Sequence, residues 1–202
     1  IGAVELEIHK GISVPDYVRD RYTRHNFSAN LLQAIQNKTD GHPLFVTQLF
    51  SLWEEKKIIV KRELSPEEDV WVVAGDEDPL QTLPVTIDAV LEERIRLMGD
   101  ELREILIRAS VQGECFTAQV ITSILKLDEY QLFCDLNTLD HTYRMVVEMG
   151  SEEVGSIVVD LYNFAHRFFR EHIYHKRLSP GQRRILHRQV GLCLEEIYKN
   201  PL

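Results

Sequence analysis

The sequence lacks a phosphate-binding loop, a membrane-spanning segment and a catalytic acid motif for nucleotide hydrolysis. No G-x-x-x-x-G-K-[ST] motif occurs in its 202 residues, and no apolar run is long enough to cross a bilayer. It also has no apolar strand followed by a metal-binding acid, and no lysine placed to stabilise a γ-phosphate. We therefore expect this chain alone to have no catalytic residues and no ATPase activity, and any phosphate chemistry would need residues outside it.

Basic residues are scarce. The chain has 23 Lys and Arg against 32 Asp and Glu, for a net charge of −9 and a pI near 5.4. This balance argues against a general nucleic-acid or anionic-membrane surface, because phosphate binding depends on clustered Lys and Arg. The main basic run, residues 176–188, alternates with apolar positions and predicts a solvated helix face.

Cysteine is also scarce, and no metal-ligand pattern occurs. Cys115, Cys134 and Cys193 are widely spaced, odd in number and set among apolar neighbours, which predicts reduced core thiols in a cytoplasmic protein. Among the histidines near the end of the chain, only His172 and His175 have tight helical spacing. No Cys or carboxylate completes a zinc-ligand set, so we expect surface histidines and no metal site.

The first half of the sequence predicts four helices and one β-hairpin. A composition of 44% hydrophobic and 27% charged residues is that of a folded protein, and the length allows one or two domains. Apolar spacing and capping residues predict helices over 14–22, 28–40, 43–56 and 84–98, with a hairpin of strands 58–62 and 70–74. Gly99 is typical of the end of one helix, and Asp100 is typical of the first turn of the next, so we predict the domain boundary at this pair.

The second half predicts three helices, then a two-stranded β-ribbon, then two further helices. Apolar stripes lie within 102–109, 120–125 and 132–139, and strand-like runs 143–149 and 156–162 flank an acidic turn over 150–155. Three compact helices followed by a two-stranded ribbon is the arrangement of a winged helix. The predicted fold class is therefore mainly α, with a small β-hairpin wing.

Two short segments place a special residue at the start of a helix. Gly41, His42 and Pro43 precede an apolar-striped helix, and His166 lies where a strand gives way to a helix. Helix starts present backbone N–H groups without intrahelical partners, so an anion or a flat polar ring can be held there. A simpler interpretation stays open for each: Gly41 and Pro43 suit a helix end and a helix start without a ligand, and a histidine can serve only to cap or pack.

Several stretches occur in the order that a known family shows. They are Val14-Pro15-Asp16-Tyr17-Val18, Thr39-Asp40-Gly41-His42-Pro43-Leu44-Phe45, Leu83-Pro84, Ala109-Ser110-Val111-Gln112-Gly113-Glu114-Cys115-Phe116, Phe164-Ala165-His166, Arg170-Glu171-His172-Ile173-Tyr174 and Arg183-Arg184-Ile185-Leu186-His187. Over nearly its whole length the chain thus resembles the post-core half of bacterial STAND ATPases, and more narrowly the predicted ATPases that accompany LuxR-type regulators and nucleotide cyclases.

The resemblance implies a domain map. Residues 1–12, whose first eight alternate as a strand, are similar to the last strand of an NTPase core. Residues 13–99 are similar to the helical lid with its small hairpin, and residues 100–178 to the winged-helix domain. Residues 179–202 are similar to a connecting helix toward a following region, which can be a helical repeat.

The resemblance also implies nucleotide contacts. The family's GxP motif falls on Gly41, His42 and Pro43, whose proline touches the adenine base, and the histidine that reads the β-phosphate falls on His166. The implied cofactor is ADP or ATP with Mg in the intact parent, with none held tightly by this chain alone. Two positions depart from the family pattern: Arg167 follows His166 where the family has Asp, and His42 stands where Asn is frequent.

Three functions remain open from the sequence. The first is a nucleotide-dependent switch whose partners are its own NTPase core, downstream sensor or effector domains and, in oligomers, further copies of the parent, with neither nucleic acid nor membrane contacted here. The second is a protein-interaction scaffold with a vestigial nucleotide site. The third is a winged-helix DNA-binding module, which needs a basic recognition helix, whereas the third helix, residues 128–140, carries acids and no Lys or Arg.

Overall fold

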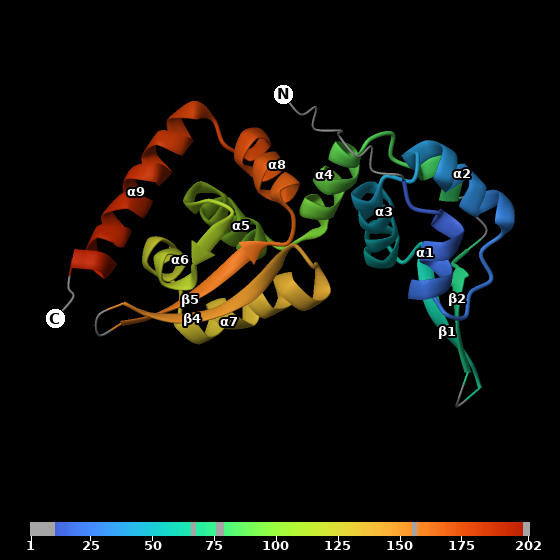
Figure 1. The fold of residues 1–202 in the computed structure, drawn as a ribbon, viewed down its shortest axis with the longest axis horizontal. Helices are drawn as coiled ribbons and strands as arrows, with labels where there is room; N and C mark the ends of the chain where they lie inside the picture. The colour runs from blue at the N-terminus through green and yellow to red at the C-terminus, as the bar shows by residue number, and fades with distance from the viewer. Residues whose placement is uncertain (1–10, 66–67, 76–78, 155–156, 200–202) are drawn as a thin grey trace, which may run out of the picture. The chain divides into compact units, whose positions relative to one another are not determined.

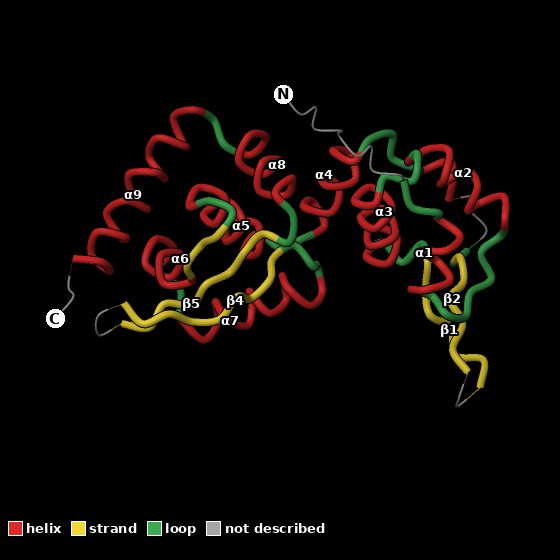
Figure 2. Tube along the Cα trace, viewed as in Figure 1, coloured by secondary structure: helices red, strands yellow, loops and turns green. Residues whose placement is uncertain are grey.

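The chain folds into two compact units, Ile1–Leu97 and Met98–Leu202, which are described one at a time. The structure is a computed structural model that describes residues 11–65, 68–75, 79–154 and 157–199. It is mostly helical with small antiparallel sheets, which confirms the mainly α prediction (Figure 2). The division lies two residues before the predicted boundary at Gly99-Asp100. The strand predicted over 1–8 lies outside the described residues.

The described part of the first unit contains four α-helices, a hairpin and a short 3-10 helix, Pro79–Thr82 (Figure 1). The helices are α1 (Val14–Arg21), α2 (Ala29–Thr39), α3 (Pro43–Glu55) and α4 (Ile87–Leu97), and the strands are β1 (Ile59–Ser65) and β2 (Glu68–Val73). Ser13 and Ser28 cap α1 and α2 through their side-chain oxygens, as their positions predicted. The prediction for α4 began three residues too early, because the Thr86 hydroxyl accepts the Ala89 N–H and starts the helix after Thr86.

Helix α3 lies at the centre of the first unit. All but one of its residues from Phe45 to Trp53 are buried, so the helix packs against other parts of the unit on several sides. Aromatic rings fill much of this core: the Tyr22 ring lies 5.4 Å from that of Phe50 and 5.0 Å from that of Trp71 on β2. These contacts join α1, α3 and the hairpin into one hydrophobic core.

A buried ion pair links α3 to α4. The Arg94 side chain is 0% exposed, and its Nε lies 2.9 Å from Oε1 of Glu55, which also accepts from Nη2. A further guanidinium nitrogen donates to the Gln48 side chain. Burial raises the pKa of the Glu55 carboxyl, although the neighbouring Arg94 acts in the opposite direction. The pair therefore fixes the register of the two helices while costing desolvation.

Removing one partner of this pair is expected to destabilise the protein more than removing both. Arg94→Met should lower the free energy of unfolding by about 3 kcal/mol, because it leaves the Glu55 carboxylate without its buried partner. The double variant Arg94→Met/Glu55→Met should lose less than Arg94→Met alone, and therefore clearly less than the sum of the two single losses. Urea unfolding of the four proteins of this cycle measures the coupling, and strictly additive losses would show that the pair does not act as a unit.

The second unit combines helices with a three-stranded antiparallel sheet. Its helices are α5 (Asp100–Gln112), α6 (Ala118–Leu125), α7 (Glu129–Asn137), α8 (Arg167–Arg177) and α9 (Pro180–Lys199), and its strands are β3 (Cys115–Thr117), β4 (Val146–Val154) and β5 (Ile157–Phe164), in the order β3-β5-β4. The pattern predicted the helices and the ribbon but missed β3. Three residues are too few to show a strand period, and β3 is defined by its pairing with β5.

The β4–β5 ribbon differs from its prediction at both ends. Residues 150–155 were expected to form the turn, but β4 continues to Val154. Gly150, with φ of +100°, instead occupies a bulge in the register, so the glycine kinks the strand without ending it. At the other end the strand begins three residues late, at Val146, because a π-helical turn, Thr138–Thr142, follows α7.

Helix α9 packs along α5 and α6, and α8 packs on α5 (Figure 1). The core beneath α9 contains Val111, Val120, Leu186 and Val190. Arg183 of α9 donates through Nε to the Tyr174 carbonyl and through Nη2 to the His175 carbonyl, so it satisfies the last carbonyls of α8. This contact fixes the corner between the two helices.

Two predictions about single side chains were wrong. Cys115 and Cys134 are exposed, so these two free thiols do not lie in the core, whereas Cys193 is half-buried and packs against the core of the second unit. His172 is buried within α8, whereas a surface position was expected. Among the described residues, no helix is long and apolar enough to cross a membrane.

Candidate functional site

Two left-handed residues connect α2 to α3. Asp40 has φ of 50° and Gly41 has φ of 64°, and together they reverse the chain within one turn. The Gly41 N–H donates to Oγ1 of Thr39 at 3.2 Å, and the His42 N–H donates to the Thr39 carbonyl at 2.9 Å. The turn is therefore closed by the last residue of α2 and presents His42 and Pro43 at the start of α3.

The turn is held from behind by the segment that precedes α1. The Ile12 N–H donates to the Gly41 carbonyl at 2.7 Å. A Cβ on Gly41 would lie 2.4 Å from the Ile12 carbonyl oxygen, and a Cβ on Gly11 would lie 2.5 Å from the Asp40 carbonyl oxygen. Gly11 and Gly41 are thus required where two backbones approach each other, and no ligand is needed to explain either glycine.

His42 is the N-cap of α3. Its Nδ1 accepts the Phe45 N–H at 3.4 Å, and Pro43, which has no N–H, is the first helical residue. His42 and Pro43 are exposed, whereas Gly41 is buried. The Leu44 N–H makes no hydrogen bond to any described residue. This helix start therefore exposes an imidazole, a pyrrolidine ring and one unsatisfied donor.

His166 is the N-cap of α8, in the second unit. Its Nδ1 accepts the Phe168 N–H at 3.0 Å, and its carbonyl accepts the Phe169 N–H at 2.9 Å. The ring is exposed, and the Arg167 N–H makes no hydrogen bond to any described residue. The end of β5 is held in place because the Phe164 N–H donates to the Glu114 carbonyl at 2.9 Å.

The positive charge beside His166 is already paired. The Arg167 Nε lies 2.7 Å from a Glu171 carboxylate oxygen and 3.4 Å from one of Glu114. These two acids raise the pKa of Arg167. Because Glu171 and Glu114 already neutralise the guanidinium charge, an anion bound at this helix start would be stabilised mainly by the His166 ring, the Arg167 backbone N–H and the helix dipole.

The two helix starts share one arrangement. In each, Nδ1 of the histidine accepts a backbone N–H, so in the neutral ring the proton lies on Nε2. Each exposed ring therefore offers an Nε2–H donor to an acceptor such as a phosphate oxygen or a ring nitrogen. The structure brings Gly41, His42 and Pro43 together in the first unit, whereas His166 belongs to the second unit.

An open cleft of about 500 Å³ lies elsewhere in the first unit. It is lined by Asn26, Ser28, Asn30, Leu31, Val73, Pro79 and Leu80. The cleft adjoins the N-terminal end of α2, whereas Gly41 follows its C-terminal end, about 16 Å along the helix axis. Sequence reasoning missed it, although Asn26, Ser28 and Asn30 form a local run of small polar residues. The lining has no charged side chain, and nothing in it suggests acid–base chemistry.

Within the described ranges, no group of three or more His, Cys, Asp or Glu side chains is arranged to hold a metal ion. Comparisons with protein-family models, with curated proteins and with solved structures found no match for this chain. A function must therefore be argued from the residues and their geometry.

Gly41→Ala is expected to lower the free energy of unfolding by about 2 kcal/mol, because the new methyl group meets the Ile12 carbonyl and the residue must keep a positive φ. Gly191→Ala is the matched control. Gly191 lies within α9 with open space around it, so its substitution should be neutral or stabilise by up to about 1 kcal/mol. Thermal or urea unfolding compares the two, and equal stabilities would contradict the close approach.

His166→Ala is expected to cost about 1 kcal/mol of stability through loss of the α8 cap, whereas His166→Asn, which can still accept a backbone N–H, should cost only a few tenths. His141→Ala supplies the control, since His141 is exposed and caps no helix. Urea denaturation measures all three. If the Ala and Asn variants were equally unstable, the histidine would act by packing and not as a cap.

Proposed function

We propose that this chain is the regulatory half of a STAND-class, nucleotide-dependent signalling ATPase of the cytoplasm. In this proposal residues 13–99 form the helical lid, residues 100–178 the winged-helix domain and residues 179–202 the connecting helix. ADP or ATP, with Mg, is bound mainly by an NTPase core that precedes the lid. Pro43 contacts the base and His166 a phosphate.

One observation carries the proposal. The two positions that the resemblance assigns to the nucleotide are both exposed helix starts, and each has a histidine N-cap and an unsatisfied backbone N–H. A helix start with a free N–H favours an anion, and a proline ring with no N–H to satisfy can lie flat against a purine. These features are what the proposed contacts require of each residue separately.

The element order of the second unit supports the winged-helix part. Three helices, α5, α6 and α7, precede the β4–β5 ribbon, and the short strand β3 between α5 and α6 adds to the same sheet. His166 then follows the ribbon directly, at the start of α8. A residue at this junction is fixed by the sheet on one side and by the helix on the other, which suits a sensor of a bound group.

The proposed mechanism is a shift between two domain arrangements. ADP would favour a closed arrangement in which the lid and the winged helix both contact it, and exchange for ATP would release the winged helix for signalling or oligomerisation. Such a switch needs only that the nucleotide interacts unequally with the two arrangements. We propose that the Nε2–H of His166 makes this unequal interaction, because it would contact the nucleotide phosphate only in the closed arrangement.

The structure offers less to a DNA-binding function. Helix α7 and the ribbon present Glu129, Asp135, Glu152 and Glu153, and α7 carries no Lys or Arg. Such a face repels a phosphate backbone. A scaffold with a vestigial site is the stronger alternative, since the caps at His42 and His166 are sufficient for stability by themselves.

A nucleotide titration of the chain tests the proposal. With millimolar ADP, we expect weak, saturable shifts of backbone amide resonances at two places, around Leu44 and around Arg167, because these N–H groups are unsatisfied. His166→Asn keeps the cap but loses the Nε2–H, so it should abolish the response at α8 and leave the response at α3 unchanged. Two-dimensional NMR of labelled protein measures both.

Adenosine and inorganic phosphate separate the two contacts. Adenosine should perturb only the α3 start, and phosphate only the α8 start. If ADP moves neither set of resonances, or moves only residues elsewhere, the nucleotide proposal fails and the scaffold alternative is favoured.

A further inference from the structure

The outer face of α9 exposes an apolar stripe. Leu186 and Val190 lie on the inner face and are buried against the core of the second unit. Ile185 and Leu192 lie on the opposite side and are 57% and 53% exposed. They are seven residues apart, two turns of helix, so they align on one face, with Arg188 between them. This spacing is the one with which a helix contacts a second helix.

Two arginines beside this stripe have no ion-pair partner within the part of the chain that the structure describes. Arg184 and Arg188, on the same helix as this stripe, are exposed and make no ion pair with any described residue. Between Glu171 and Glu195 the sequence contains no acid at all. Seven other arginines form ion pairs with described residues, and these seven lie outside this corner: Arg19, Arg21, Arg94, Arg96, Arg103, Arg108 and Arg167. In a chain of net charge −9, the corner is therefore a local basic surface.

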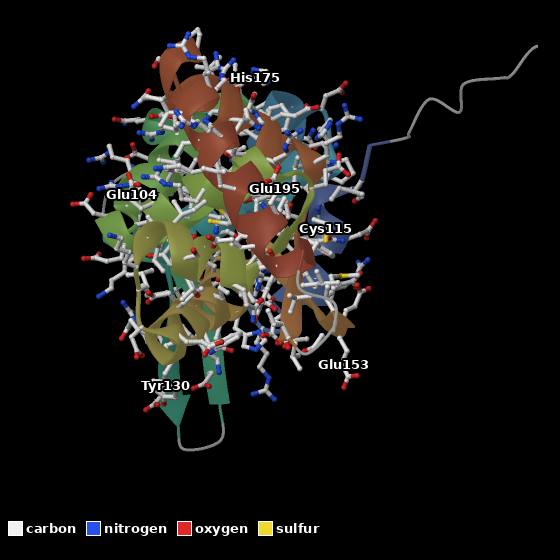
Figure 3. The ribbon with its side chains drawn as sticks, turned by 90° about the vertical axis from the view of Figure 1, so that its left-hand side faces the viewer. Glu104, Cys115, Tyr130, Glu153, His175 and Glu195 are labelled. Atoms are coloured by element: carbon white, nitrogen blue, oxygen red, sulfur yellow. The ribbon has the colours of Figure 1, made fainter. Side chains whose placement is uncertain are left out.

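Several side-chain contacts hold this corner together. The Arg183 guanidinium lies 4.6 Å from the centre of the Tyr174 ring and bonds the last carbonyls of α8. The Arg170 guanidinium lies 5.2 Å from the same ring and donates to the Ser110 carbonyl of α5. The Tyr174 hydroxyl lies 2.9 Å from Nε2 of His187. Because these contacts fix both helices, the exposed cations are presented on a preformed frame. Figure 3 looks onto α9, with His175 labelled near the corner and Glu195 farther along the helix.

We propose that Arg184, Ile185, Arg188 and Leu192 form a docking surface, the α9 outer face, for an acidic amphipathic helix of a protein partner. The apolar pair would pack on the leucines of that helix, and the two arginines would pair with its acids. A nucleic acid fits less well, since its extended charge would meet the net negative charge of the rest of the chain. The inference does not depend on the nucleotide proposal.

A labelled peptide tests this surface. The probe is a fluorescein-labelled peptide of about five helical turns with Leu at the a and d positions and Glu at most others. We expect saturable binding that weakens as salt is added, and no binding of a peptide with the same residues in scrambled order. Arg184→Glu/Arg188→Glu and Ile185→Ser/Leu192→Ser should each weaken binding about tenfold or more. Fluorescence anisotropy measures all of these affinities.

A matched control changes two exposed cations of the first unit. Lys38→Glu/Arg62→Glu makes the same change in net charge at residues that form no ion pair with described residues, and it should leave the affinity within about twofold. Circular dichroism and thermal unfolding confirm that each variant folds. All the substituted side chains are exposed, so folding should be retained.

Four outcomes would overturn the proposal. They are no binding by the wild type, equal binding of the scrambled peptide, wild-type affinity in both α9 variants, or tighter binding of a random DNA duplex that Arg184→Glu/Arg188→Glu removes. Sedimentation of the protein alone adds a fifth: a salt-sensitive dimer that the same variant dissolves would make the occupant a second copy of this chain.

Discussion

The close approach of two backbones at Gly11 and Gly41 is the constraint on which the first helix start depends. Because neither residue has a side chain, the Ile12 N–H can reach the Gly41 carbonyl, at 2.7 Å, and the segment before α1 lies directly behind the turn. The left-handed conformations of Asp40 and Gly41 then reverse the chain and direct His42 and Pro43 outward. A larger residue at either glycine would move the start of α3, and with it everything that this helix start can contact.

Histidine is used in the same way in both units. Ser, Thr, Asp and Asn are the usual N-caps, and Ser13, Ser28 and Asp128 follow that rule. His42 and His166 perform the same task with Nδ1 and leave a second, differently placed donor on Nε2. An imidazole cap thus satisfies the helix and remains available to a ligand, which a hydroxyl cap does less well. The proposed nucleotide contacts rest on this double use.

Local signals predicted the helices well and the sheets less well. Ser13, Ser28 and Pro43 mark helix starts by their own chemistry, so α1, α2 and α3 followed from sequence. Strand β3 did not, because it exists through its pairing with β5. Gly150 was expected to make a turn but makes a bulge, since the pairing of neighbouring strands decides which role a glycine takes. At the candidate site the sequence identified the residues but not the capping geometry, which depends on side-chain orientation.

The most direct test of the account is a crystal structure, grown with ADP, of this chain together with the nucleotide-binding core that we propose precedes it. The account predicts that Nε2 of His166 lies within hydrogen-bond distance of a phosphate oxygen and that the Pro43 ring lies against the adenine. An ADP held by the core alone, with both side chains facing solvent, would contradict it.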